Sequence, residues 1–395
     1  MIAYNHTLIR NISIVKKSKQ WFSKQLISTE QLSIVLKKYK TEFYSPNLFI
    51  KIGLFIFTLF AIFSAYGFYI SMFIIGQYIA GYFAFSCFLF SVICVCALEF
   101  FIKNNNLYNA GVDECILYSA LGFSFVGIGI MIKYDFNLFD NKTLFLSILT
   151  VPFFIASIVR YADKLVTLAL GICFYFIFFL TLLKLGDVAK LIMPFALMIV
   201  SVLVYLASKK YKQLESFHYL NKCFIVIECI ALVVFYLAGN YYVIRESSIA
   251  YFGLKLNKGE DIPLAFLFYI LTAIVPLVYV YYGLKNKDKL LLWIGLILIV
   301  IAALTFKNYF SLGHPEIILT LSGFIMIVIA YVSIRILKTP KYGITFEEEP
   351  DEDNFLKSNA EAMMIAQNFG QNEQTSSDTK FGGGNFGGAG SGGNF

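Results

Sequence analysis

The sequence predicts an all-α fold, a polytopic membrane helix bundle of about ten transmembrane helices, and three observations support it. Of the 395 residues, 58% are hydrophobic and only 14% are charged, whereas soluble domains carry about 25% charged residues. The apolar residues form blocks of about 20, the helix length that crosses a hydrocarbon layer about 30 Å thick. Lys and Arg gather in alternate connections between these blocks, as in chains that cross a membrane repeatedly.

The first two expected spans form one long apolar stretch. We expect it to divide at GQYIAGY, residues 76–82, because its glutamine and glycines suit a turn between helices. The ten expected spans are 48–70, 78–102, 113–132, 143–159, 164–184, 190–208, 222–240, 262–283, 289–306 and 316–337.

The distribution of positive charge predicts the orientation. In and beside the connections, 21 Lys and Arg residues fall on the side of the N-terminus and 8 on the other side. Because cytoplasmic connections are enriched in Lys and Arg, both termini are expected in the cytoplasm. Heavy use of Phe, Ile, Lys and Asn suggests an AT-rich genome, so we expect a bacterial inner (cytoplasmic) membrane.

Residues 1–47 precede the first span, are basic and read as a cytoplasmic helical hairpin. Ser28 can cap a helix, with Gln31 as its capping-box partner. An apolar face follows at helical spacing. Its residues are Leu32, Val35, Leu36 and Tyr39, and the opposing face is expected from Ile9, Ile12, Trp21 and Phe22.

This N-terminal stretch resembles a known family. The residues that carry the resemblance are Leu26, Ile27, Ser28, Glu30, Gln31, Ile34, Leu36 and Tyr39, followed by IKIGLFIFTLFAIFSAYGF at 50–68. In them the chain is similar to the N-terminal module of predicted bacterial membrane proteins, the domain-of-unknown-function family 2157. The likeness covers about the first 130 residues. It implies a membrane protein and brings no catalytic residue.

The C-terminal region, 338–395, is expected in the cytoplasm in three parts. Six acidic residues lie within 345–355, and 354–370 can form a short amphipathic helix. The tail KFGGGNFGGAGSGGNF is expected to be flexible, because Gly loses the most conformational freedom on ordering. It resembles the tails of TPM-type membrane proteins. Its aromatic residues are either spaced anchors for a partner or parts of a plain linker. They are Phe381, Phe386 and Phe395.

The sequence contains no phosphate-binding glycine loop, nucleophile elbow, zinc-ligand spacing or paired-carboxylate motif. We therefore expect no catalytic residue, no cofactor and no metal ion, and we favour a non-enzymatic protein.

Two charged residues lie inside expected spans. Glu228 is about six residues into the span 222–240, and Lys51 is about one turn into the first span. Three roles stay open for Glu228: a protonated or hydrogen-bonded structural residue, a member of a structural ion pair, or a group that couples transport to protons. We expect its side chain to face the bundle interior, with Lys51 as a candidate partner.

Two functional hypotheses follow. The favoured one is a partner-binding or accessory membrane protein that uses its soluble ends. Besides the lipid bilayer, its expected partners are anionic lipid at the basic N-terminus or a protein at both ends, and no nucleic acid. The alternative is a low-specificity transporter or channel with Glu228 as its intramembrane carboxylate. A polar cavity reaching Glu228 from both sides would favour transport.

Overall fold

The protein is an all-helical, multi-pass membrane protein. Its computed structural model describes the residues listed here: 3–4, 6–23, 25–40, 43–44, 46–73, 80–134, 141–252, 261–309, 320, 323–324, 327–328, 331–332 and 334–335. Nine helices among them are long and apolar enough to cross a membrane, with mean hydropathies of 1.9 to 2.5.

The nine long helices correspond to the first nine expected spans, and the division between the first two falls where the sequence places it. They are α3 (Leu48–Phe73), α4 (Ala80–Asn105), α5 (Val112–Tyr134), α6 (Lys142–Tyr161), α7 (Lys164–Leu183), α8 (Asp187–Lys212), α9 (Asn221–Gly239), α11 (Ala265–Lys285) and α12 (Lys289–Tyr309). A 3₁₀ turn, η1 (Glu215–Leu220), joins α8 to α9. The tenth expected span, 316–337, and the region 338–395 with Phe381, Phe386 and Phe395 lie largely or wholly outside the described residues.

Two further helices precede the bundle. These are α1 (His6–Ser23) and α2 (Thr29–Lys38), which pack against each other. The predicted capping box is confirmed: the Gln31 amide donates to Ser28 Oγ at 3.2 Å, and the Ser28 amide donates to Gln31 Oε1 at 2.9 Å. The expected opposing face is only partly right, because Trp21 and Phe22 stay exposed. They lie at the end of α1 where the chain turns toward α2, and the Leu26 amide donates to the Trp21 carbonyl there.

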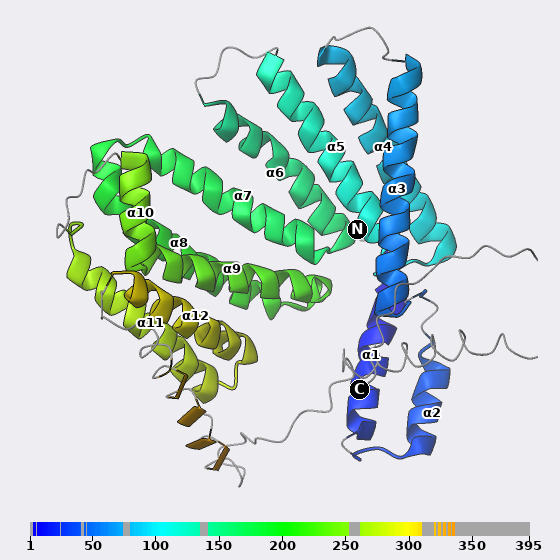
Figure 1. The fold of residues 1–395 in the computed structure, drawn as a ribbon. Helices are drawn as coiled ribbons and strands as arrows, with labels where there is room; N and C mark the ends of the chain where they lie inside the picture. The colour runs from blue at the N-terminus through cyan, green and yellow to red at the C-terminus, as the bar shows by residue number, and fades with distance from the viewer. Residues whose placement is uncertain are drawn as a thin grey trace, which may run out of the picture.

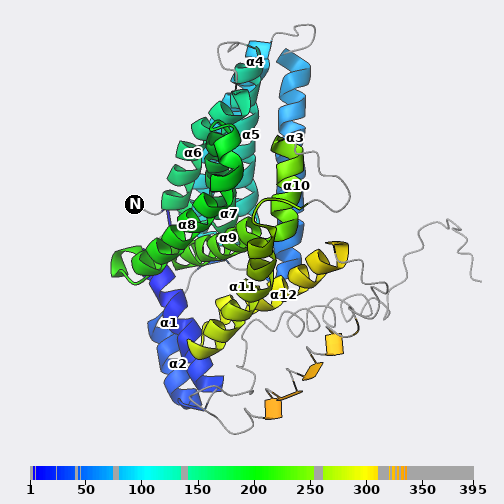
Figure 2. The same cartoon turned by 90° about the vertical axis from the view of Figure 1, so that its left-hand side faces the viewer.

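The long helices spread like a fan (Figure 1). Those from α3 to α6 stand side by side, α7 to α9 cross at a steep angle, and α11 pairs with α12 at the far edge. Successive helices run in opposite directions, so the ends near residues 48, 105, 161, 212 and 285 converge on the side where α1 lies. We call this side the α1 end. The α1–α2 hairpin lies beyond it in both views (Figures 1 and 2).

One helix was not predicted from the sequence. The connection after α9, expected to be a loop, begins with α10 (Tyr241–Phe252). Asn240 starts it: its Oδ1 accepts hydrogen bonds from the amides of Tyr242 at 3.0 Å and Val243 at 3.3 Å, which is how an N-cap satisfies the first turn. Twelve residues span about 18 Å, too short to cross a bilayer, so α9 and α11 remain antiparallel.

The α11–α12 hairpin is held by close backbone contact. A Cβ atom placed on Gly283 would lie 2.7 Å from the backbone nitrogen of Leu292, and one on Gly295 would lie 2.9 Å from that of Val280. Small residues let membrane helices approach in this way. The short connection then fixes the position of residues 286–288 at the α1 end.

Gly283→Ala should lower stability by about 1–3 kcal/mol, because the added methyl group meets backbone rather than a movable side chain. The matched control is Gly67→Ala in α3, where nothing lies within 4 Å of the new Cβ. The temperature at which half of the detergent-solubilised protein is lost from the monodisperse gel-filtration peak should fall only for Gly283→Ala. Equal thermal stability of the two variants would show that the helices are not in this contact.

Candidate functional site

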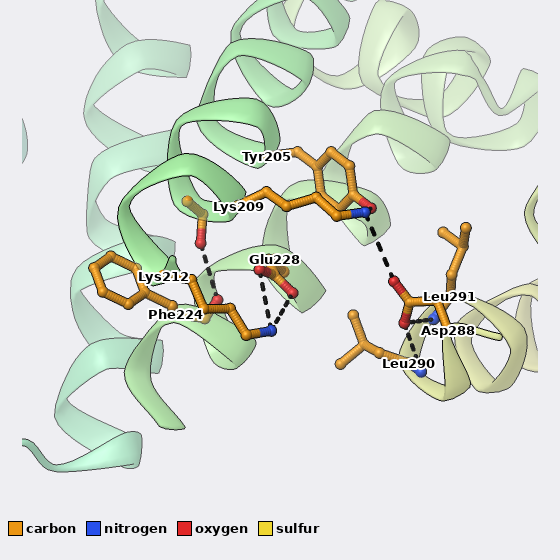
Figure 3. Close-up of polar contacts among 9 residues, drawn as sticks. Tyr205, Lys209, Lys212, Phe224, Glu228, Asp288, Leu290 and Leu291 are labelled. Atoms are coloured by element: carbon orange, nitrogen blue, oxygen red, sulfur yellow. Dashed lines mark hydrogen bonds and ion pairs between the residues drawn. The ribbon is translucent and has the colours of Figure 1, made fainter. Parts of the chain in front are cut away.

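Glu228 lies on a helix enclosed by its neighbours. Helix α9 packs against α7, α8, α10, α11 and α12, and Glu228 is only 4% exposed. Its carboxylate accepts hydrogen bonds from Lys212 Nζ at 3.1 and 3.3 Å (Figure 3). Lys212 ends α8 and reaches across to α9. Of the three roles left open, this geometry is that of an ion pair, and the expected inward orientation is confirmed.

The expected partnership between Glu228 and Lys51 is wrong. Lys51 Nζ instead lies 2.6 Å from Glu114 Oε1, because α3 packs against α5. The sequence did hold a signal for the true partner. Lys212 and Glu228 flank the connection of one helical hairpin, so both lie at the same end of adjacent helices.

The Glu228 ion pair lines a polar mouth at the α1 end. This mouth has a volume of about 410 Å³ and is formed by the ends of α8, α9 and α12 and by the α11–α12 connection. Its charged residues are Lys209, Lys212, Lys287, Lys289, Glu228 and Asp288. Sequence analysis missed five of these six, because the mouth depends on which hairpins pack together.

A second, largely apolar chamber adjoins the mouth. Its volume is about 350 Å³, and it shares Lys209 and Asn286 with the mouth. Most of its wall is apolar or aromatic and includes Val202, Ala231, Leu232, Phe235, Val278 and Tyr279. It extends along α8 as far as Ser201, eleven residues from the end of that helix, or roughly 16 Å.

Lys209 stands where the two chambers meet. Its ammonium donates to Tyr205 Oη at 3.1 Å and lies 3.9 Å from Asp288 Oδ2 (Figure 3). Asp288 is also the cap of α12, since its Oδ1 accepts from the amides of Leu290 at 3.1 Å and Leu291 at 3.4 Å. The carboxylate is therefore engaged mainly by the helix, and its contact with Lys209 is loose.

Other charges at the α1 end are also paired. Arg160 donates two hydrogen bonds of 2.8 Å to Glu99, which also accepts one from Tyr161. Asp113 accepts from two backbone amides of the α4–α5 connection at 2.9 Å. It also accepts from Tyr4 at 3.4 Å, and burial is the main cause that raises the pKa of Tyr4 above its ordinary value. These contacts join α4 to α6 and the N-terminus to the bundle, which is a structural role.

A separate cavity lies between the opposite halves of α8 and α9. It is smaller, about 150 Å³, and its wall is largely apolar, with Met193, Pro194, Leu237 and Ile244 among its residues. It shares no lining residue with the apolar chamber beside Glu228. Among the described residues, these two cavities are therefore separate. Within the described residues, no group of three or more His, Cys, Asp and Glu side chains could hold a metal ion.

Comparison with protein-family models, with curated proteins and with solved structures finds no match for this chain. The resemblance to the domain-of-unknown-function family 2157 and to TPM-type tails therefore stays a prediction.

The ion pair predicts a specific coupling between two substitutions. Glu228→Gln should keep the protein folded but cost about 1–3 kcal/mol, because it leaves Lys212 without its counter-charge. This value lies below that for fully buried pairs because the Lys212 side chain is 33% exposed. Adding Lys212→Gln should recover at least about 1 kcal/mol in thermal or denaturant unfolding.

Lys285→Gln serves as the control second substitution, since Lys285 lies over the rings of Tyr281 and Tyr282 and lines neither chamber. Its effect should add to that of Glu228→Gln without coupling. If the stability effects of Glu228→Gln and Lys212→Gln were also additive, Lys212 would not be the partner that stabilises Glu228.

Proposed function

We propose that this chain is a non-enzymatic accessory protein of the bacterial inner membrane that binds a partner protein through its N-terminal hairpin. The proposal rests on the exposed apolar tip of that hairpin. Trp21 is 49% exposed and Leu26 is 68% exposed, with Phe22 between them. We call these three residues the tip patch. The Leu26 amide donates to the Trp21 carbonyl at 2.9 Å, so the chain turns within the patch.

The position of the tip patch favours a protein over lipid as its partner. Helix α1 has 18 residues and is therefore about 27 Å long, and it leads away from the bundle (Figures 1 and 2). An interfacial helix lies only about 5–10 Å into the headgroup region. Trp is among the residues enriched in binding hot spots. Exposed Lys17 and Lys19 lie on α1 within about one turn of Trp21, so we expect the partner surface to be acidic.

The transport alternative receives less support from the geometry. Glu228 is held in an ion pair, and beyond it the chamber wall is mainly apolar. A transport path would need polar groups that continue toward the opposite side. The smaller cavity in that direction is apolar as well.

The orientation supports a cytoplasmic partner. The sequence assigns 21 basic residues to the side of the N-terminus and 8 to the other side, so we expect both termini in the cytoplasm. A reporter active only in the cytoplasm should give signal when fused after residue 341. One active only in the periplasm should give signal when inserted within 253–260, after α10. The reverse pattern at either position would overturn the orientation.

The tip patch should crosslink to one defined protein. A photoreactive amino acid at position 22 in the full-length protein in intact cells should give a single discrete adduct. Trp21→Asp with Leu26→Asp should weaken that adduct at least about tenfold, because hot-spot residues contribute about 2 kcal/mol or more each.

Ile34→Asp is the matched control: Ile34 is also apolar and 63% exposed, but it lies on α2 outside the tip patch. It should leave the adduct unchanged. Adducts to lipid alone, or equal losses in the tip and control variants, would refute binding through the tip.

A further inference from the structure

The cavity beside Glu228 consists of two adjoining pockets with different kinds of surface. Its mouth at the α1 end carries four lysines and two carboxylates, and its inner chamber is mainly apolar and aromatic. Lys209 and Asn286 line both parts. A ligand that fills the space must therefore have a polar head and an apolar chain.

The charge balance of the mouth favours an anionic head. Glu228 is engaged by Lys212, and Asp288 is engaged by the first turn of α12. An incoming cation would find both carboxylates already bound. Lys209 has three N–H donors and uses one on Tyr205, and its ammonium lies at a loose 3.9 Å from Asp288 Oδ2. The exposed Lys287 adds a second positive charge at the rim.

The size and chemistry of the inner chamber favour a single acyl chain. Its 350 Å³ is near the lower end of the range for small-molecule pockets, about 300–1,000 Å³. Tyr279, one of its polar side chains, already donates to the Leu232 carbonyl at 3.1 Å, so its hydroxyl does not call for a polar ligand atom. The wall formed by Val202, Leu232, Phe235 and Val278 offers apolar contact.

We propose that this cavity is a binding site for a single-chain anionic amphiphile of the fatty-acid type. The carboxylate binds at the mouth beside Lys209, and the acyl chain lies in the inner chamber between α8, α9 and α11. Lys212 and Glu228 complete the wall around the head group, and their opposite charges balance each other. The site lies in the bundle and does not depend on the hairpin.

The direct test is photolabelling of the intact protein in digitonin. The probe is a 12-carbon carboxylate with a diazirine at the end of its chain. Digestion and mass spectrometry should place the label on residues of the inner chamber, chiefly in 231–235 of α9 or 278–279 of α11. Unlabelled laurate should compete. A probe with the same chain and a trimethylammonium head should label these positions at least about tenfold less.

Two substitutions test the two ends of the ligand separately, Lys209→Gln at its head and Val278→Trp at its chain. Lys209→Gln should raise the laurate concentration needed for half-competition about three- to tenfold, the size expected when a partly exposed charge-assisted hydrogen bond is lost. Val278→Trp should fill the chamber and remove the label. Lys285→Gln, at the same end but outside the cavity, should change neither measurement.

Several results would overturn the site. Equal labelling by the cationic and anionic probes would show an unspecific apolar surface. Competition by phosphatidylglycerol but not by laurate would show a two-chain lipid site instead. Label outside the chamber in the unmodified protein would refute the site even if a variant failed to fold.

Discussion

A carboxylate that stays ionised on an enclosed membrane helix needs a cation or other polar partner within reach, and Lys212 meets that need for Glu228. The pair joins the ends of α8 and α9 and makes one wall of the polar mouth. If Glu228 lacked its partner, the cost of an unpaired buried charge would oppose packing of α9 among its neighbours. The ion pair thus connects the fold of the second half of the bundle to its candidate ligand site.

The same requirement explains why polar contacts gather at the α1 end. Glu114 is paired with Lys51, and Glu99 is paired with Arg160. These pairs tie helices that are distant in sequence, so they specify which helices are neighbours in a medium where apolar surfaces alone distinguish little. At the mouth the lysines outnumber the carboxylates, and the surplus of positive charge makes the cavity suitable for an anion.

Length and hydropathy were sufficient to predict nine of the long helices, because a membrane span needs about 20 apolar residues whatever it packs against. The helix α10 escaped prediction because Arg245, Glu246 and two serines interrupt its apolar pattern, although Asn240 is a recognisable N-cap. The prediction that Lys51 holds Glu228 was wrong because depth along the membrane does not reveal which helices are adjacent. The mouth could not be predicted, since it requires the α11–α12 connection to lie beside α8.

An experimental structure of the full-length protein in lipid nanodiscs tests the central claim most directly. The account predicts the Glu228 carboxylate within about 3–4 Å of Lys212 Nζ, in a cavity that opens at the α1 end and closes against apolar side chains. A Glu228 side chain that faces lipid would contradict it. So would a Glu228 side chain in a continuous polar path that reaches the opposite side of the bundle.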